Sequence, residues 1–190
     1  MPRDVDLAQR LADVAAATVQ VARPWGAHSV TIRSVAGQLG GSTTLVTNYL
    51  PSRAALILNA LDHGRDRWRD ELDAALAGVA DEQRLSTVID WSLTSTSDDP
   101  VLRTLIMEIV ANAAVEPDMA ASLRRESTEF RELLRSAAEE SGFAEPDHVA
   151  GLAYLLVRGA YIAATEDPDQ WTDARIRRTI QGTVSAQPRL

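Results

Sequence analysis

The sequence predicts an all-α protein of about nine helices, and three observations support this fold class. Apolar residues recur three or four positions apart through most of the 190 residues. Glycine and proline separate these segments, and no segment shows the alternation of apolar and polar residues that is typical of a strand. Hydrophobic residues make up 45% of the chain, which is enough for a substantial core.

The first predicted helix runs from Asp4 to Ala22 and ends before the sequence Pro24-Trp25-Gly26. Its apolar positions fall on one face of a helix. They are Leu7, Leu11, Val14, Ala15, Thr18, Val21 and Ala22. We expect this face to cover the short helices that follow.

Two short helices joined by a glycine turn are predicted between residues 29 and 50. The first is capped by Ser29 or Thr31 and ends at Gly40-Gly41, because glycine adopts the left-handed conformation that follows a helix end. Ser42 is expected to cap the second, which ends before Pro51. This order is typical of a helix-turn-helix, whose second helix lies in the major groove of DNA.

Six further helices are predicted from the same apolar spacing and from the proline and glycine breaks. They cover residues 53–76, 81–94, 100–114, 119–141, 146–165 and 172–185. A turn is expected at residues 95–99, and the tail at residues 187–190 is expected to be frayed.

The segment GGSTTLVTNYLPSRAAL (residues 40–56) resembles the recognition-helix signature of the tetracycline-repressor (TetR) family. Gly40, Ser42, Tyr49, Ser52 and Leu56 fall on matching positions, and Arg53 stands at a position where the family pattern has lysine. The preceding VTIRSVAGQLG also resembles the family pattern, with Thr31 on a family threonine. The resemblance implies a DNA-binding domain at residues 1–52 and an effector-binding and dimerisation domain at residues 53–190.

Hydroxyl, amide and arginine side chains gather in this segment, and such groups bind phosphates or base edges. The candidate DNA-binding residues are Thr31, Arg33, Ser42, Thr43, Thr44, Leu45, Thr47, Asn48, Tyr49 and Arg53. The resemblance implies that Thr31, Tyr49 and Arg53 contact phosphates. The base edges are expected to face Thr43, Leu45, Thr47 and Asn48. The Asn48 amide can pair with adenine, and Leu45 can pack on a thymine methyl group if it faces outward.

The segment at residues 148–164 is apolar nearly all round, so it must be buried or covered by a partner. The resemblance implies that the last two helices form a four-helix interface in a homodimer. The candidate interface residues are Leu152, Leu155, Leu156, Gly159, Ile176 and Ile180. An internal core helix is the alternative for one face of this segment.

Aromatic and apolar side chains of the helical body are candidates for an effector pocket, and filling of the core is the alternative. They are Trp68, Trp91, Met107, Asn112, Phe130 and Tyr154. In the family, a small molecule bound in the body changes the spacing of the DNA-binding heads. The apolar character of this set favours a hydrophobic or weakly polar effector.

The formal charge of −8 is unevenly distributed along the chain. Residues 1–53 carry five arginines against three acidic residues, so this end alone is weakly basic and suits contact with DNA. No catalytic motif, cysteine, signal pattern or membrane-length apolar run is present. We expect a cytoplasmic, non-enzymatic, effector-released repressor that needs no cofactor and binds a near-palindromic double-stranded operator as a homodimer.

One alternative is a helical small-molecule-binding protein whose DNA-binding head is degenerate. Three departures from the family pattern support it. The resemblance implies an apolar residue at Gly41, a small residue, often glycine, at Thr44, and an aromatic residue at Thr47. A small all-α enzyme is the other, and it requires a pair of catalytic polar groups that the sequence does not reveal.

Overall fold

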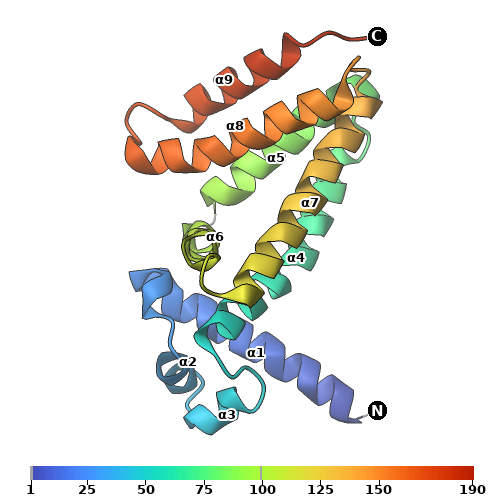
Figure 1. Cartoon of the computed structure of the whole chain (residues 1–190). Helices are drawn as coiled ribbons and strands as arrows, with labels where there is room; N and C mark the ends of the chain where they lie inside the picture. Colours follow the sequence, from blue (N-terminus) through green and yellow to red (C-terminus); the bar gives the residue numbers. More distant parts are fainter. Residues whose placement is uncertain (1, 99) are drawn as a thin grey trace. The chain divides into compact units, whose positions relative to one another are not determined.

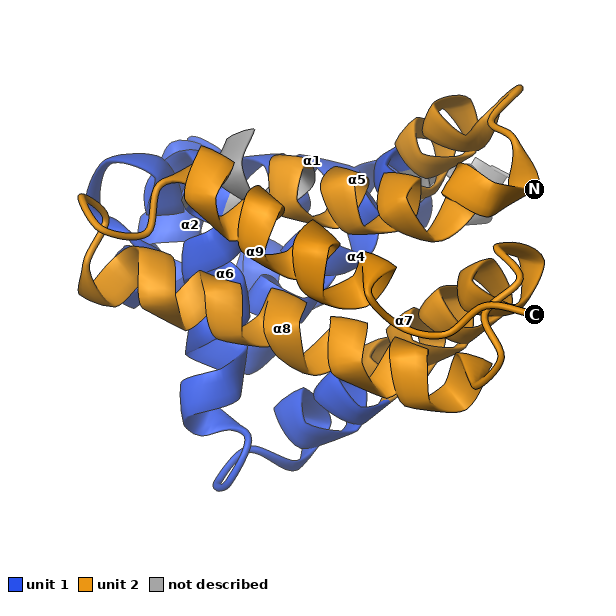
Figure 2. Ribbon diagram, turned by 90° about the horizontal axis from the view of Figure 1, so that it is seen from above, with its two compact units in different colours: residues 1–68, 99–124 blue, residues 69–98, 125–190 orange. Residues whose placement is uncertain are grey.

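The structure is a computed structural model that describes residues 2–98 and 100–190. Within these ranges it contains nine α-helices, two short 3₁₀ helices and no strand, which confirms the all-α prediction (Figure 1). The chain packs into two compact units, one of residues 1–68 and 99–124 and one of residues 69–98 and 125–190 (Figure 2). The predicted functional division at residue 52 stays a prediction. No helix in the described ranges is both long and apolar enough to cross a bilayer.

The first unit holds the helix-turn-helix. Its elements are α1 (Pro2–Trp25), η1 (Ala27–Ser29), α2 (Ile32–Gln38), α3 (Thr43–Thr47), the first part of α4 (Arg53–Leu76), α6 (Pro100–Asn112) and the start of α7 (Pro117–Glu140). Helix α1 is longer than predicted and contains Pro24 in its last turn. Helices α2 and α3 pack against each other, and α2 also packs on α1.

One apolar core joins these elements. Val14 of α1, Val35 of α2, Val46 of α3 and Leu56 of α4 are all at most 2% exposed and belong to one buried cluster. Leu105 of α6 is 2% exposed in the same cluster. The first unit is therefore built around the helix-turn-helix and α6 together, because each of these short helices needs the others to bury its apolar face.

The second unit contains the remaining helices. Its elements are the end of α4, η2 (Asp81–Gln83), α5 (Arg84–Asp98), the rest of α7, α8 (Pro146–Glu166) and α9 (Asp173–Ser185). The turn predicted at residues 95–99 is wrong for residues 95–98, which continue α5 as a helix. Asp99 lies outside the described residues.

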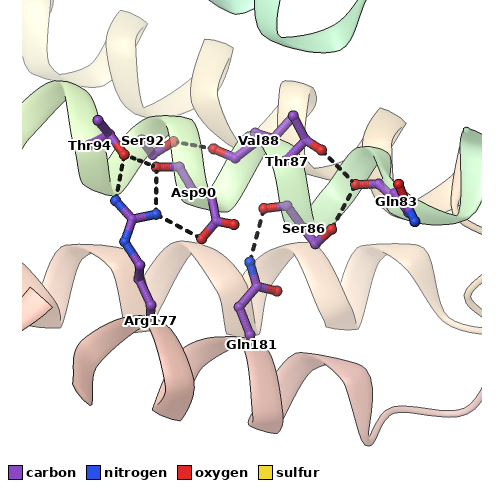
Figure 3. Close-up of polar contacts among 9 residues, drawn as sticks. All are labelled: Gln83, Ser86, Thr87, Val88, Asp90, Ser92, Thr94, Arg177 and Gln181. Carbon is purple, nitrogen blue, oxygen red and sulfur yellow. Dashed lines mark hydrogen bonds and ion pairs between the residues drawn. The ribbon is translucent and has the colours of Figure 1, made fainter. Parts of the chain in front are cut away.

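Helix α9 packs on α5 through an apolar face and through polar contacts of Arg177 with Asp90 and Thr94 and of Gln181 with Ser86 (Figure 3). Ile176 and Ile180 on the apolar face of α9 are 6% and 3% exposed and belong to the core of this unit. Beside them, the Arg177 guanidinium donates to the Asp90 carboxylate at 2.9 Å, and the Gln181 amide donates to the Ser86 carbonyl at 2.9 Å. Helix α9 therefore buries its isoleucines against its own subunit.

The last residues of the chain are paired rather than frayed, in contrast to the prediction. The Leu190 amide donates to the Gly142 carbonyl at 2.9 Å, and the Ala144 amide donates to the Pro188 carbonyl at 3.0 Å. The Arg189 guanidinium lies over the Phe143 ring, 4.5 Å from its centre. Backbone pairing and this cation–π contact together hold the tail to the turn between α7 and α8.

Candidate nucleic-acid interface

Helix α2 begins with a capping box formed by Thr31 and Ser34. The Ser34 amide donates to Thr31 Oγ1 at 3.0 Å, and the Thr31 amide donates to Ser34 Oγ at 2.9 Å. Two amides that a helix start leaves unpaired are thereby satisfied. Thr31 is exposed at the amino end of the helix, where a phosphate would meet both its hydroxyl and the positive end of the helix dipole.

The turn between α2 and α3 is a Schellman motif centred on Gly40. Gly40 has a φ of 68°, its amide donates to the Gly37 carbonyl at 3.0 Å, and the Gly41 amide donates to the Ala36 carbonyl at 3.0 Å. A side chain at Gly40 would be strained, since other residues rarely adopt this conformation. The predicted glycine break is thus confirmed, and it sets the angle at which the chain enters α3.

Gly41 has a separate reason, which lies in packing. A Cβ at this position would stand 2.8 Å from Leu45 Cδ2, so the Leu45 side chain occupies the space where a larger residue would project. Leu45 is half-buried as a result. Its side chain turns back toward the turn, which leaves it less available to a thymine methyl group than we expected.

Helix α3 presents polar groups to solvent and a single valine to the core. Val46 is 0% exposed, while the remaining candidates from this segment are exposed. These exposed residues are Ser42, Thr43, Thr44, Thr47, Asn48 and Tyr49. Ser42 occupies the N-cap position but makes no side-chain capping bond, so its hydroxyl is not committed to the helix end. The structure thus leaves the predicted polar residues of this segment accessible to solvent.

Arg53 differs from our expectation, because its guanidinium is engaged within the first unit. It donates to the Ala27 carbonyl at 2.7 Å, to the Val30 carbonyl at 2.9 Å and to the Glu108 carboxylate at 2.5 Å. Glu108 also accepts from the Asn112 amide at 2.9 Å. Arg53 therefore ties the segment before α2 to α6, whereas Arg33 on α2 is exposed.

The predicted effector residues fall into two groups. Trp68, Met107 and Asn112 belong to the first unit, and Trp91, Phe130 and Tyr154 belong to the second. Asn112 is bound to Glu108, and Met107 is 37% exposed. A pocket formed by all six residues stays a prediction.

An aromatic and cationic cluster lies between α7 and α8 in the second unit. The rings of Phe130 and Tyr154 have their centres 6.0 Å apart, and the Arg158 guanidinium lies 5.7 and 5.3 Å from them. Arg158 also binds Glu126 at 2.6 Å, and Tyr154 shares a 2.8 Å hydrogen bond with Ser127. Burial alone lowers the pKa of Arg158, but the nearby Glu126 carboxylate raises it above its ordinary value, so this residue stays cationic.

The predicted dimer residues also divide into two groups. Leu155 and Gly159 are exposed on α8, Leu155 to 69%, and the nearby Ile162 is 51% exposed. Leu152 and Leu156 are half-buried. Ile176 and Ile180 are corrected from interface to core, because α9 turns them toward its own subunit.

Glu108 is the functional candidate that sequence reasoning missed. Arg53 and Glu108 are 55 positions apart, and no spacing rule connects them. The sequence offered one signal for its role, namely that Glu108 is a single acidic residue on the strongly apolar helix α6.

The comparisons with known proteins agree with this geometry. The family described as "BetI-type transcriptional repressor, C-terminal" matches residues 81–188, more than half of the chain. Sequence comparison with curated proteins finds no match.

Three solved structures share the fold. A TetR transcription regulator from Haloarcula marismortui is 21% identical, with a TM-score of 0.83 over 95% of this chain and 98% of that one. A Saccharomonospora viridis protein in complex with choline is 17% identical, with a TM-score of 0.76 over 94% and 97%. A transcriptional regulator from Bacillus subtilis in complex with stearoyl-CoA is 10% identical, with a TM-score of 0.72 over 92% and 97%. On the family match and the shared fold, the chain belongs to the TetR family of transcriptional regulators, and its C-terminal part is of the BetI type.

Proposed function

We propose that this regulator is a repressor that binds a near-palindromic operator as a homodimer and leaves it when an effector binds. The observation that carries the proposal is the outer face of α3, where Thr43, Thr47 and Asn48 are exposed around a buried Val46. Residues that pack no core are free to meet base edges, and the Asn48 amide suits adenine. Thr31, Ser42 and Tyr49 then bind phosphates on either side of the groove.

Arg33 is proposed as the arginine that neutralises a phosphate. It is exposed on α2, whereas Arg53 already gives its donors to Ala27, Val30 and Glu108. Arg53 acts instead as a positioning residue that fixes the segment before α2. Replacing a residue that binds a phosphate reduces the salt dependence of DNA binding. Replacing a positioning residue weakens DNA binding with little change in its salt dependence.

Self-association is proposed to occur through the exposed stripe of α8. Leu155, Gly159 and Ile162 follow one another at helical spacing, and the large apolar side chains among them are more than half exposed. A contiguous apolar stripe of this kind marks an interface in a soluble protein. Two-fold symmetry would predict an operator whose half-sites lie about one helical turn apart, or a multiple of it.

The effector is proposed to bind in the second unit beside Phe130, Tyr154 and Arg158. The buried indole N–H of Trp91 has no partner among the described groups, and such a donor is a candidate for an effector's acceptor. The choline and the stearoyl-CoA bound by two structural relatives differ in charge and size, so they support binding of a small molecule by this fold but do not indicate one ligand. The apolar rings favour a hydrophobic or weakly polar effector.

The test is a DNA-binding measurement with the region upstream of the protein's own coding sequence, at about 150 mM salt with competitor DNA. We expect a footprint over two half-sites related by approximate symmetry. Asn48→Ala should relax the preference at one position in each half-site, while the matched control Gln38→Ala, exposed on α2, should not. Binding without sequence preference would support the alternative of a small-molecule-binding protein whose head no longer reads DNA.

A further inference from the structure

A cleft of about 350 Å³ opens on the first unit between α1, α4 and α6. Of the residues predicted above to line an effector pocket, Trp68 alone lines this cleft. Alanines create it, since Ala12, Ala15 and Ala16 of α1 face Ala60 of α4 across the gap. Val101 and Leu105 of α6 form its floor. The volume is within the range of sites that hold small organic ligands.

Gly64 and Trp68 shape one wall of the cleft. A Cβ at Gly64 would stand 2.9 Å from Trp68 Cζ2 and 3.1 Å from Cη2, so the indole lies flat against the helix at this glycine. Any side chain at position 64 would push the ring outward. The glycine thereby allows an aromatic face to line an otherwise aliphatic cavity.

The charges around the cleft are all of one sign. Arg23 of α1 and Arg67 and His63 of α4 line it, and none of its lining residues is acidic, although the chain has 27 acidic residues against 19 arginines. The Nδ1 atom of His63 contacts the Asn59 carbonyl at 3.0 Å. Arg23 is exposed at the last turn of α1.

We propose that this cleft binds a small amphipathic anion, a carboxylate with a short aliphatic chain. The chain lies against Trp68 and Leu105, and the carboxylate faces the exposed Arg23. A bound anion bridges α1 to α4 and α6 and stabilises the first unit by mass action. This site is distinct from the effector site proposed beside Phe130, Tyr154 and Arg158, which all belong to the second unit.

The test is a titration of the full-length, DNA-free protein with octanoate, followed by intrinsic tryptophan fluorescence and by calorimetry. We expect saturable binding, and we expect the fluorescence change to be lost in Trp68→Phe but kept in Trp171→Phe. Octylamine, which has the same chain and the opposite charge, should bind at least tenfold more weakly, since the cleft repels a cation.

Two variants locate the ligand. Arg23→Gln removes the exposed charge and should weaken octanoate binding about tenfold, as expected for one charge-assisted hydrogen bond. Ala16→Phe fills the cleft and should abolish binding, whereas Ala8→Phe, at an exposed alanine of the same helix outside the cleft, should leave it unchanged.

Lack of saturable binding by wild-type protein would overturn the proposal. Octanoate affinity equal to that of the wild-type protein in both Arg23→Gln and Ala16→Phe would also overturn it, because the octanoate would then bind elsewhere. The measurement uses no DNA, so its failure would leave the proposed repressor function unaffected.

Discussion

Replacing Glu108 on α6 should lower both the stability of the first unit and its affinity for DNA, although this residue lies outside the recognition helix. Its carboxylate receives the Arg53 guanidinium at 2.5 Å and the Asn112 amide at 2.9 Å. Arg53 in turn holds the carbonyls of Ala27 and Val30, immediately before α2. Loss of the carboxylate thus loosens the segment that positions the helix-turn-helix.

The size of the effect follows from burial. A hydrogen bond to a charged group contributes about 1.5–3 kcal/mol, and an exposed ion pair contributes about 0–1 kcal/mol. The Arg53 and Glu108 side chains are 34% and 21% exposed, so solvent screens part of their attraction. We therefore expect Glu108→Ala to lower the free energy of unfolding by about 1–2 kcal/mol, or the melting temperature by about 2–8 °C. Glu108→Gln keeps an acceptor for Arg53 and should cost about half as much.

Urea unfolding of a double-mutant cycle with Arg53→Gln isolates the pair, and we expect a coupling energy of about 1 kcal/mol. The matched control is Glu140→Gln, which breaks the Arg84–Glu140 ion pair of the second unit, whose side chains are 29% and 43% exposed. Both variants should lose stability, but Glu108→Gln alone should lose operator affinity.

The salt dependence of binding distinguishes positioning from phosphate contact. If Arg53 acts through the fold, Arg53→Gln weakens operator binding at every salt concentration with nearly the same slope. A slope reduced by about one unit would refute this reasoning and return Arg53 to the phosphate role. A coupling energy near zero between Arg53 and Glu108 would refute it independently.

Three further predictions follow from glycines and from one recognition residue. Gly40→Ala should destabilise the protein by about 1–2 kcal/mol in urea unfolding, because Gly40 has a left-handed backbone conformation. The control Gly37→Ala, in the adjacent helix with open space around it, should stabilise the protein by about 0.5–1 kcal/mol. Equal effects of the two substitutions would contradict the Schellman assignment. Gly159→Arg should convert a dimer to a monomer in light scattering, Gly37→Arg serving as control, and an unchanged mass would place the interface elsewhere. Tyr49→Phe should weaken all DNA sequences about equally, and a change in sequence preference would instead assign it to a base.

The helix-turn-helix could be predicted from sequence because its determinants are local. Thr31 and Ser34 are three positions apart, and Gly40 follows its helix directly, so spacing rules capture both. Contacts between residues that are far apart in the sequence cannot be predicted from such spacing rules. The spacing of Ile176 and Ile180 correctly marks an apolar face, but periodicity does not say whether that face meets its own subunit or a second copy.

The contacts of Arg53 illustrate the same limit for charged residues. A family lysine position filled by arginine suggests a phosphate ligand, and its sequence neighbours offer no competing acid. The competitor is Glu108, which reaches Arg53 through the packing of α6 in the first unit. A planar guanidinium can satisfy two carbonyls and a carboxylate at once, and a lysine ammonium matches such a fixed fork less well.

The structure also changes the weight of the three departures that favoured a degenerate DNA-binding head. Gly41 now has a packing reason, since Leu45 fills the space that a larger residue would need. An apolar residue in that turn and a leucine that packs over a glycine can fill the same space, so Gly41 no longer argues against DNA binding. Thr44 and Thr47 are exposed and their hydroxyls can donate or accept. The alternative therefore depends on whether two hydroxyls can replace a small residue and an aromatic one at the DNA surface. Measuring operator binding by Thr44→Gly and Thr47→Tyr tests this directly. Restoring the family residues should raise operator affinity modestly if the DNA-binding head is functional, and should create binding where the wild-type protein has none if the head is degenerate.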